Sequence, residues 1–65
     1  MKQKLVILGA GESGVGTAIL GKQQGYDVFV SDYGAIKDIY AQVLSRNLIN
    51  WEDKGHTVSQ IISAD

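Results

Sequence analysis

The sequence predicts an α/β fold with the element order β-α-β-α-β-α, in which a parallel sheet lies between layers of helices. Three observations predict it. Short apolar runs recur along the chain, as is typical of buried strands. The stretches between these runs have the periodicity of helices. Glycines follow the first run, at the place where a strand would connect to a helix. With 65 residues, the chain has the size of one small domain.

The first strand and the first helix are predicted within residues 5–25. Residues 5–8 form a continuous apolar run, which is typical of a strand buried on both faces of a parallel sheet. From residue 13 to residue 24 the spacing becomes helical, with Val15, Ala18 and Ile19 on one face. Gly25 is expected to cap this helix, because glycine adopts the left-handed conformation common at helix ends.

A second strand is predicted at residues 28–31, which are mostly β-branched or aromatic. The next helix is indicated by side chains spaced three or four positions apart: Ile36, Ile39, Tyr40, Val43, Leu44 and Asn47. Residues 49–52 are a shorter third strand and residues 53–55 a turn. Thr57 and Gln60 then fit a capping box that opens a third helix, through about residue 62.

The chain ends at Asp65, where a fourth strand is expected, so we expect residues 1–65 to be part of a longer protein. In this interpretation the α/β unit is truncated before a further strand. A three-stranded parallel sheet leaves two open edges, through which the fragment is expected to be able to self-associate.

Composition excludes several classes of function. The formal net charge is −1 and no basic stripe is present, so nucleic-acid binding is not expected. The apolar run at residues 5–8 is too short for a signal peptide, and no stretch approaches the length of a transmembrane helix, so membrane insertion is not expected. The chain has no cysteine, which fits a cytoplasmic protein.

A Gly-x-Gly-x-x-Gly motif, made of Gly9, Gly11 and Gly14, follows the first predicted strand. Its glycines allow a sharp turn, the approach of a phosphate to the backbone, and close packing of helix on strand. The helix start offers N–H groups and a positive dipole end to an anion. Asp32 lies 18 positions after Gly14, where a carboxylate bonds ribose or another part of a nucleoside. A Rossmann-like nucleotide-binding unit is predicted; a glycine turn that serves only packing is the alternative.

Each candidate residue also has a structural interpretation. Ser13 is either a helix N-cap or a phosphate ligand, whereas Glu12 is expected to point to solvent and to lend only its backbone N–H. Asp32 is either a nucleoside ligand or a turn residue, and Tyr33 either stacks on a base or is half-buried. The other aromatic side chains expected to fill the core are Tyr26, Phe29 and Trp51.

Catalytic and metal chemistry are not predicted. His56, the single histidine, lies beside a turn glycine and a capping threonine, where a structural role is favoured. It has no companion ligands, so no metal site is expected, and Glu52 and Asp53 are interpreted as a solvated turn. The sequence contains neither a P-loop nor a recognisable nucleophile–base pair, so the chain is expected to bind a ligand without catalysing a reaction.

The residues alone leave the ligand open between dinucleotides and other nucleotide diphosphates. The motif by itself favours a nicotinamide or flavin cofactor, NAD(P) or FAD, bound by one half of an oxidoreductase. A third hypothesis is a non-catalytic interaction module that assembles through its sheet edges.

Residues 6–16 and 25–32, together with a short element that begins at Gly55, resemble the N-terminal domain of the Mur ligases. The likeness extends over essentially all 65 residues. The glycine loop is common to many Rossmann proteins. More particular to this family is the late Gly-His-Thr element at residues 55–57, followed by Ile61, Ala64 and Asp65. Within the family, the chain is most similar to the branch that adds D-glutamate. Some relatives carry a hydroxyl residue and an arginine where this chain has Tyr33 and Gly34.

The resemblance implies that residues 1–65 are a fragment of the N-terminal domain, which holds the UDP end of a UDP-sugar-peptide substrate. It implies a longer cytoplasmic ligase of peptidoglycan synthesis, and hence of cell-wall growth, cell shape and division. ATP and Mg²⁺ would bind in a central domain and the amino acid partly in a C-terminal one. A substrate carboxyl would be phosphorylated to an acyl phosphate, which the D-glutamate amine attacks. The fragment itself is expected to hold no cofactor.

The same resemblance assigns site residues by position. The loop that would meet the diphosphate contains Gly9, Gly11, Glu12, Ser13 and Gly14. The segment that would meet the uracil nucleoside is Asp32, Tyr33 and Gly34. The following strand and a Ser-Pro-Gly turn, which complete the uridine pocket in the family, would lie beyond Asp65.

Overall fold

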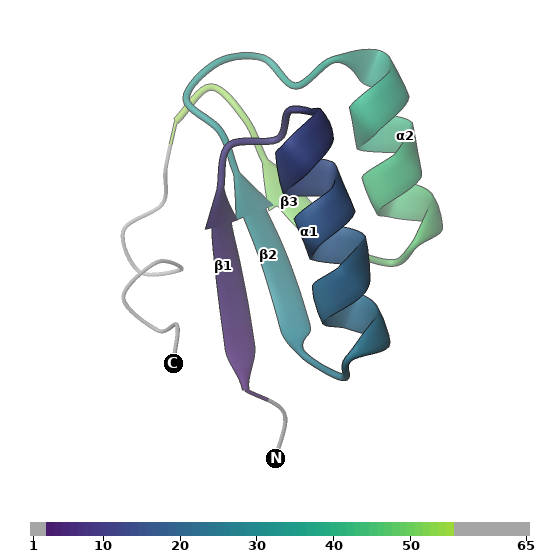
Figure 1. Cartoon of the computed structure of the whole chain (residues 1–65). Coiled ribbons are helices and arrows are strands. Elements are labelled where there is room, and N and C mark those ends of the chain that lie inside the picture. The colour runs from purple at the N-terminus through teal and green to yellow at the C-terminus, as the bar shows by residue number, and fades with distance from the viewer. Residues whose placement is uncertain (1–2, 56–65) are drawn as a thin grey trace.

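A computed structural model of the chain describes residues 3–55 and shows three strands and two helices (Figure 1). Along the chain these are β1 (Lys4–Leu8), α1 (Glu12–Gln23), β2 (Asp27–Ser31), α2 (Asp38–Arg46) and β3 (Asn50–Glu52). The strands lie in the order β1-β2-β3, and both neighbouring pairs are parallel. The predicted Rossmann-like α/β arrangement is confirmed for this part of the chain. The predicted third helix, and the third layer that it would supply, lie outside the described residues.

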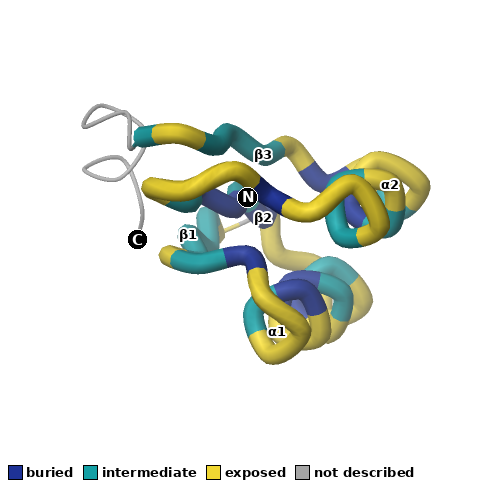
Figure 2. The backbone as a smooth tube through the Cα atoms, turned by 90° about the horizontal axis from the view of Figure 1, so that it is seen from above, coloured by how far each residue is buried: buried dark blue, intermediate teal, exposed yellow. Residues whose placement is uncertain are grey.

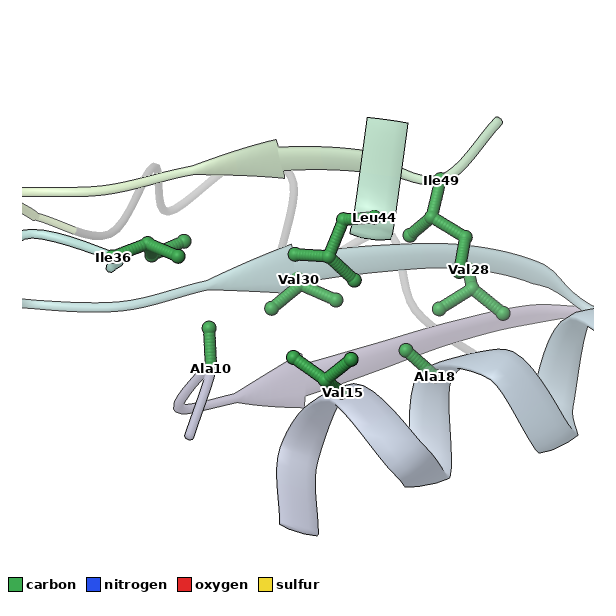
Figure 3. Close-up of a cluster of buried hydrophobic side chains, with 8 residues drawn as sticks. All are labelled: Ala10, Val15, Ala18, Val28, Val30, Ile36, Leu44 and Ile49. Atoms are coloured by element: carbon green, nitrogen blue, oxygen red, sulfur yellow. The ribbon is translucent and has the colours of Figure 1, made fainter. Parts of the chain in front are cut away.

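The two helices lie side by side on one face of the sheet (Figures 1 and 2). Between them and the sheet lies the hydrophobic core, to which both helices and the central strand contribute side chains (Figure 3). Its buried members are Ala10, Val15, Ala18, Val28, Val30, Ile36, Leu44 and Ile49. Because both crossovers pass over the same face, the opposite face of the sheet carries no helix within residues 3–55.

The end of α1 has the hydrogen bonds of a Schellman motif. The Tyr26 N–H donates to the Gly21 carbonyl at 3.0 Å, and the Gly25 N–H donates to the Lys22 carbonyl at 3.1 Å. Gly25 has φ +91°, which a side chain would disfavour. The predicted glycine cap is therefore confirmed. Tyr26, expected in the core, is instead 37% exposed, because this turn carries it away from the helix–sheet interface.

The first strand differs from its prediction. Leu8 is 62% exposed and the rest of residues 4–8 are half-buried, although burial on both faces was expected. The reason is that both described helices cover the same face of the sheet. On the opposite face lies Phe29, which is half-buried and has the Lys4 ammonium 5.7 Å from its ring centroid.

The second helix has a narrower apolar stripe than its sequence predicts. Leu44 is fully buried, and Ile36 is buried just before the helix begins, but Ile39 is 65% exposed. At about 100° per residue, Ile39 lies roughly 140° around the helix from Leu44. Since α2 approaches the core mainly through Leu44, a side chain at that angle faces away from it.

Candidate functional site

The glycine loop connects the end of β1 to the start of α1. Gly9 has φ +106°, a left-handed conformation that favours glycine, and its N–H donates to the Ser31 carbonyl of β2 at 2.7 Å. Ala10 then turns into the core, where it is 3% exposed. The loop is thus fixed at both of its first residues before the helix begins.

Gly14 is where α1 packs against the backbone of the glycine loop. A Cβ atom there would overlap the carbonyl oxygen of Gly9 and lie 3.6 Å from Cγ2 of Ile7. Gly11 differs, because a Cβ on that residue would meet nothing within 4 Å. The third glycine of the motif therefore serves close packing, and the second leaves open space beside the helix start.

The start of α1 exposes backbone donors. Gly11 is the N-cap residue, with φ −77° and ψ −172°, and no side chain caps the helix. Within residues 3–55, the N–H groups of residues 11–14 donate no hydrogen bond, and residues 11–13 are exposed. The interpretation of Ser13 as N-cap is wrong, since it lies inside the first turn. Free N–H groups at the positive end of a helix dipole are suited to an anion.

Asp32 follows β2 and links two loops. Its Oδ2 accepts the Ala10 N–H at 2.8 Å, and its Oδ1 accepts the Gly34 N–H at 2.9 Å. The second bond is the local Asx-type turn expected of such a residue, whereas the first reaches across to the glycine loop. Asp32 is half-buried, and the neighbouring Tyr33 is 77% exposed.

The structure brings the two predicted halves of the site together. Leu8 of β1 pairs with Ser31 of β2, so the glycine loop and the segment at residues 32–34 emerge side by side at the carboxyl edge of the sheet (Figure 1). Ligands of open α/β sheets bind at this edge, at the point where the strand order reverses. In residues 3–55 the order runs in one direction, so the described chain supplies one side of such a crevice.

Two carboxylates near this edge were not recognised from the sequence. Glu52 accepts the Ser31 hydroxyl at 2.7 Å, and Asp53 accepts the Ile36 N–H at 3.2 Å. Their interpretation as a solvated turn is wrong, because both hold neighbouring segments in place. The Ser31–Glu52 pair follows from the parallel register, in which these two residues are partners, and that register is hard to predict without the fold.

Other features lie away from this edge. A shallow hollow at the opposite end of the sheet is lined by Ser45, Leu48, Ile49, Asn50 and Trp51. Among the described residues, no group of three or more His, Cys, Asp or Glu side chains could hold a metal ion, and no helix could cross a membrane. His56 lies outside the described residues.

The chain matches curated relatives that share one name, UDP-N-acetylmuramoylalanine–D-glutamate ligase. The relative from Christiangramia forsetii is 62% identical over 65 residues, that from Bacteroides fragilis 54% over 63, and that from Chlorobium chlorochromatii 41% over 63. The matches cover 97% to 100% of this chain but 13% to 15% of each relative. No protein-family model and no solved structure matches the chain.

These identities confirm the resemblance drawn from the sequence. The chain is homologous over its whole length to the N-terminal part of the UDP-N-acetylmuramoylalanine–D-glutamate ligases, which are Mur ligases.

Proposed function

We propose that this chain binds the UDP end of UDP-N-acetylmuramoyl-L-alanine, as the N-terminal domain of a ligase that adds D-glutamate. The observation that carries the proposal is the uncapped start of α1, with exposed backbone at residues 11–13, in a chain homologous to these ligases. The proposed diphosphate ligands lie in the loop formed by Gly9, Gly11, Glu12, Ser13 and Gly14. The segment proposed to meet the nucleoside is formed by Asp32, Tyr33 and Gly34.

The diphosphate half of the proposal depends on backbone donors. An α-helix leaves its first four N–H groups without partners inside the helix, and its N-terminus carries about half a positive charge. A diphosphate can accept several such bonds at once. Glu12 is exposed, so its carboxylate can stay in solvent while its N–H donates. Gly11 leaves the space into which a phosphate oxygen would fit.

The nucleoside half depends on the segment after β2. Tyr33 is exposed and directly follows Asp32, whose carboxylate bonds the glycine loop, and aromatic rings stack on bases. The next residue, Gly34, has no side chain, so its backbone is open to a ligand beside Tyr33. In this proposal Tyr33 covers one face of the uracil and replaces the hydroxyl residue found in some relatives.

The chemistry of the longer enzyme is part of the same proposal. ATP and Mg²⁺ would bind in a second domain, and the substrate carboxyl would be activated as an acyl phosphate before the D-glutamate amine attacks it. The described residues contain neither a P-loop nor a nucleophile–base pair, so their part is to hold the substrate. We place the enzyme in the cytoplasm and in peptidoglycan synthesis.

Two other functions compete with UDP binding and are tested beside it. A nicotinamide or flavin dinucleotide would use the same glycine loop, with Asp32 on the adenosine ribose. Self-association would use the sheet edges, because β1 and β3 each pair only with β2 among residues 3–55. Analytical ultracentrifugation of the chain tests the second alternative, since a concentration-independent monomer excludes it.

The binding test compares two glycine variants. Gly11→Ala adds a methyl group where the structure is empty and the backbone is already extended, so the chain should still fold. We expect its affinity for UDP to fall about tenfold, because the methyl group occupies the phosphate position. Gly16→Ala is the matched control, since its Cβ also meets nothing within 4 Å and it lies beyond the first turn.

Calorimetric titration of the chain with UDP and with NAD completes the experiment. Tighter binding of UDP than NAD, lost in Gly11→Ala and kept in Gly16→Ala, supports the proposal. Tighter binding of NAD contradicts it, as does UDP affinity that Gly11→Ala leaves unchanged. If neither ligand binds, a longer chain that includes the next strand distinguishes an incomplete pocket from an interaction module.

A further inference from the structure

Asp32 makes hydrogen bonds to the glycine loop, to the segment after β2 and to the third strand and the turn that follows it. Its carboxylate accepts N–H groups from Ala10 in the glycine loop and from Gly34 in the segment after β2. Its backbone reaches the third strand: the Asp32 N–H donates to the Glu52 carbonyl at 3.1 Å, and the Gly55 N–H donates to the Asp32 carbonyl at 3.1 Å. One residue therefore holds together the chain segments that follow β1, β2 and β3.

The bond to Ala10 bears directly on the proposed phosphate site. Ala10 immediately precedes Gly11, the N-cap residue of α1, and it is 22 positions from Asp32 in the sequence. Holding the Ala10 N–H on a carboxylate fixes the orientation of the next peptide groups, which carry the free donors. Backbone donors fixed before binding cost less conformational entropy when the ligand arrives.

Charge supports the same role. A free carboxylate beside a diphosphate would repel it, whereas a carboxylate that accepts two N–H bonds has much of its charge satisfied by the protein. The acidic residue at the end of the second strand is usually expected to bond the nucleoside itself. Here both of its oxygens already accept backbone N–H groups.

We propose that Asp32 is a positioning residue, which acts on the diphosphate by holding the glycine loop in its binding conformation. This inference rests on the proposed function. It deepens that function by assigning the carboxylate to the loop, whereas the nucleoside contact is left to Tyr33 and Gly34. The consequence is that loss of the carboxylate weakens every ligand that carries a diphosphate, whatever nucleoside is attached.

The test uses three variants of the chain. Asp32→Ala removes both acceptors, and Asp32→Asn keeps a single side-chain oxygen, so its effect should be intermediate. Asp53→Asn is the matched control, because Asp53 also accepts one backbone N–H at the same edge, from Ile36, and has no bond to the glycine loop. Amide NMR of each variant, with no ligand, reports on the loop itself.

We expect the Ala10 amide in Asp32→Ala to exchange with solvent about tenfold faster and its proton resonance to move upfield. The Gly25 amide, at the far end of α1, is the internal reference and should not change. An Ala10 amide that is unaffected in Asp32→Ala overturns the proposal without any ligand being present.

The ligand arm separates a loop effect from a direct contact. Inorganic pyrophosphate, UDP and 2′-deoxy-UDP are titrated into the chain and its variants. A positioning role predicts that Asp32→Asn weakens all three by the same factor, about tenfold, while Asp53→Asn leaves them unchanged. If Asp32→Asn weakens UDP but not pyrophosphate, or has no effect on 2′-deoxy-UDP, Asp32 bonds the nucleoside and the proposal is wrong.

UDP binding by the chain and the positioning role of Asp32 can be refuted separately. If UDP does not bind the wild-type chain or a longer one, the proposed function fails, and this proposal fails with it even if the Ala10 amide responds as expected. If UDP binds and the Ala10 amide does not respond, only the positioning role fails.

Discussion

The close approach of α1 to the Gly9 carbonyl predicts a large difference between two Gly→Ala substitutions in the same helix. At Gly14 the new methyl group would overlap the Gly9 carbonyl oxygen and lie 3.1 Å from its carbon. The loop cannot simply withdraw, because its N–H groups are bonded to Ser31 at 2.7 Å and to Asp32 at 2.8 Å. At Gly16 the methyl group would meet nothing within 4 Å.

The magnitude follows from these contacts. Overpacking of this kind costs about 1–3 kcal/mol, and alanine in a helix offsets about 0.5–1 kcal/mol of that loss. We therefore expect Gly14→Ala to lower the free energy of unfolding by about 1.3 kcal/mol, and by at most about 2.5 kcal/mol. Gly16→Ala should raise it by about 0.5–1 kcal/mol, because only the intrinsic gain remains.

Urea unfolding of both variants measures the difference. Circular dichroism follows the helices, and the fluorescence of Trp51, the only tryptophan of the chain, follows packing against α2. For a domain of this size, about 1 kcal/mol corresponds to roughly 4–8 °C in Tm. A Gly14→Ala chain as stable as Gly16→Ala would refute the inference that this glycine is required by packing.

Four further substitutions test other parts of the fold by the same unfolding measurement. Ser31→Ala should lower the free energy of unfolding by about 1.5–3 kcal/mol, because it removes a buried hydroxyl bonded to a carboxylate. A loss below about 0.5 kcal/mol would contradict that role of the hydroxyl. Leu44→Ala should lower the free energy of unfolding by about 2–5 kcal/mol, because Leu44 is fully buried. At the exposed Ile39, the same substitution should lower it by less than about 1 kcal/mol. Similar losses at the two positions would show that α2 packs differently. Gly25→Ala should cost about 1–2 kcal/mol because of its positive φ, and an unchanged stability would argue against the Schellman cap.

The order of the described elements could be predicted from local patterns. Alternating apolar runs and helical spacing placed three strands and two helices within about two residues of their observed positions, with Gly25 marking the end of α1. These features depend on residues close together in the chain. Local spacing also suffices for the glycine motif, which predicted the close approach at Gly14.

Features that depend on distant residues could not be predicted in this way. The exposure of Leu8 and Ile39 depends on which face the helices cover and on how α2 is rotated. The hydrogen bond from Ala10 to Asp32 joins residues 22 positions apart. The Ser31–Glu52 pair requires the register of β2 and β3, so a carboxylate that looks like part of a solvated turn becomes the partner of a buried hydroxyl.

Residue-by-residue amide NMR during titration with UDP, and separately with uridine, tests the proposed diphosphate site most directly. The free N–H groups at the start of α1 predict that UDP shifts the amides of residues 11–14 most strongly and that uridine, which lacks phosphate, leaves them nearly unchanged. Equal shifts with both ligands, or UDP shifts confined to residues away from the glycine loop, would contradict the proposed site.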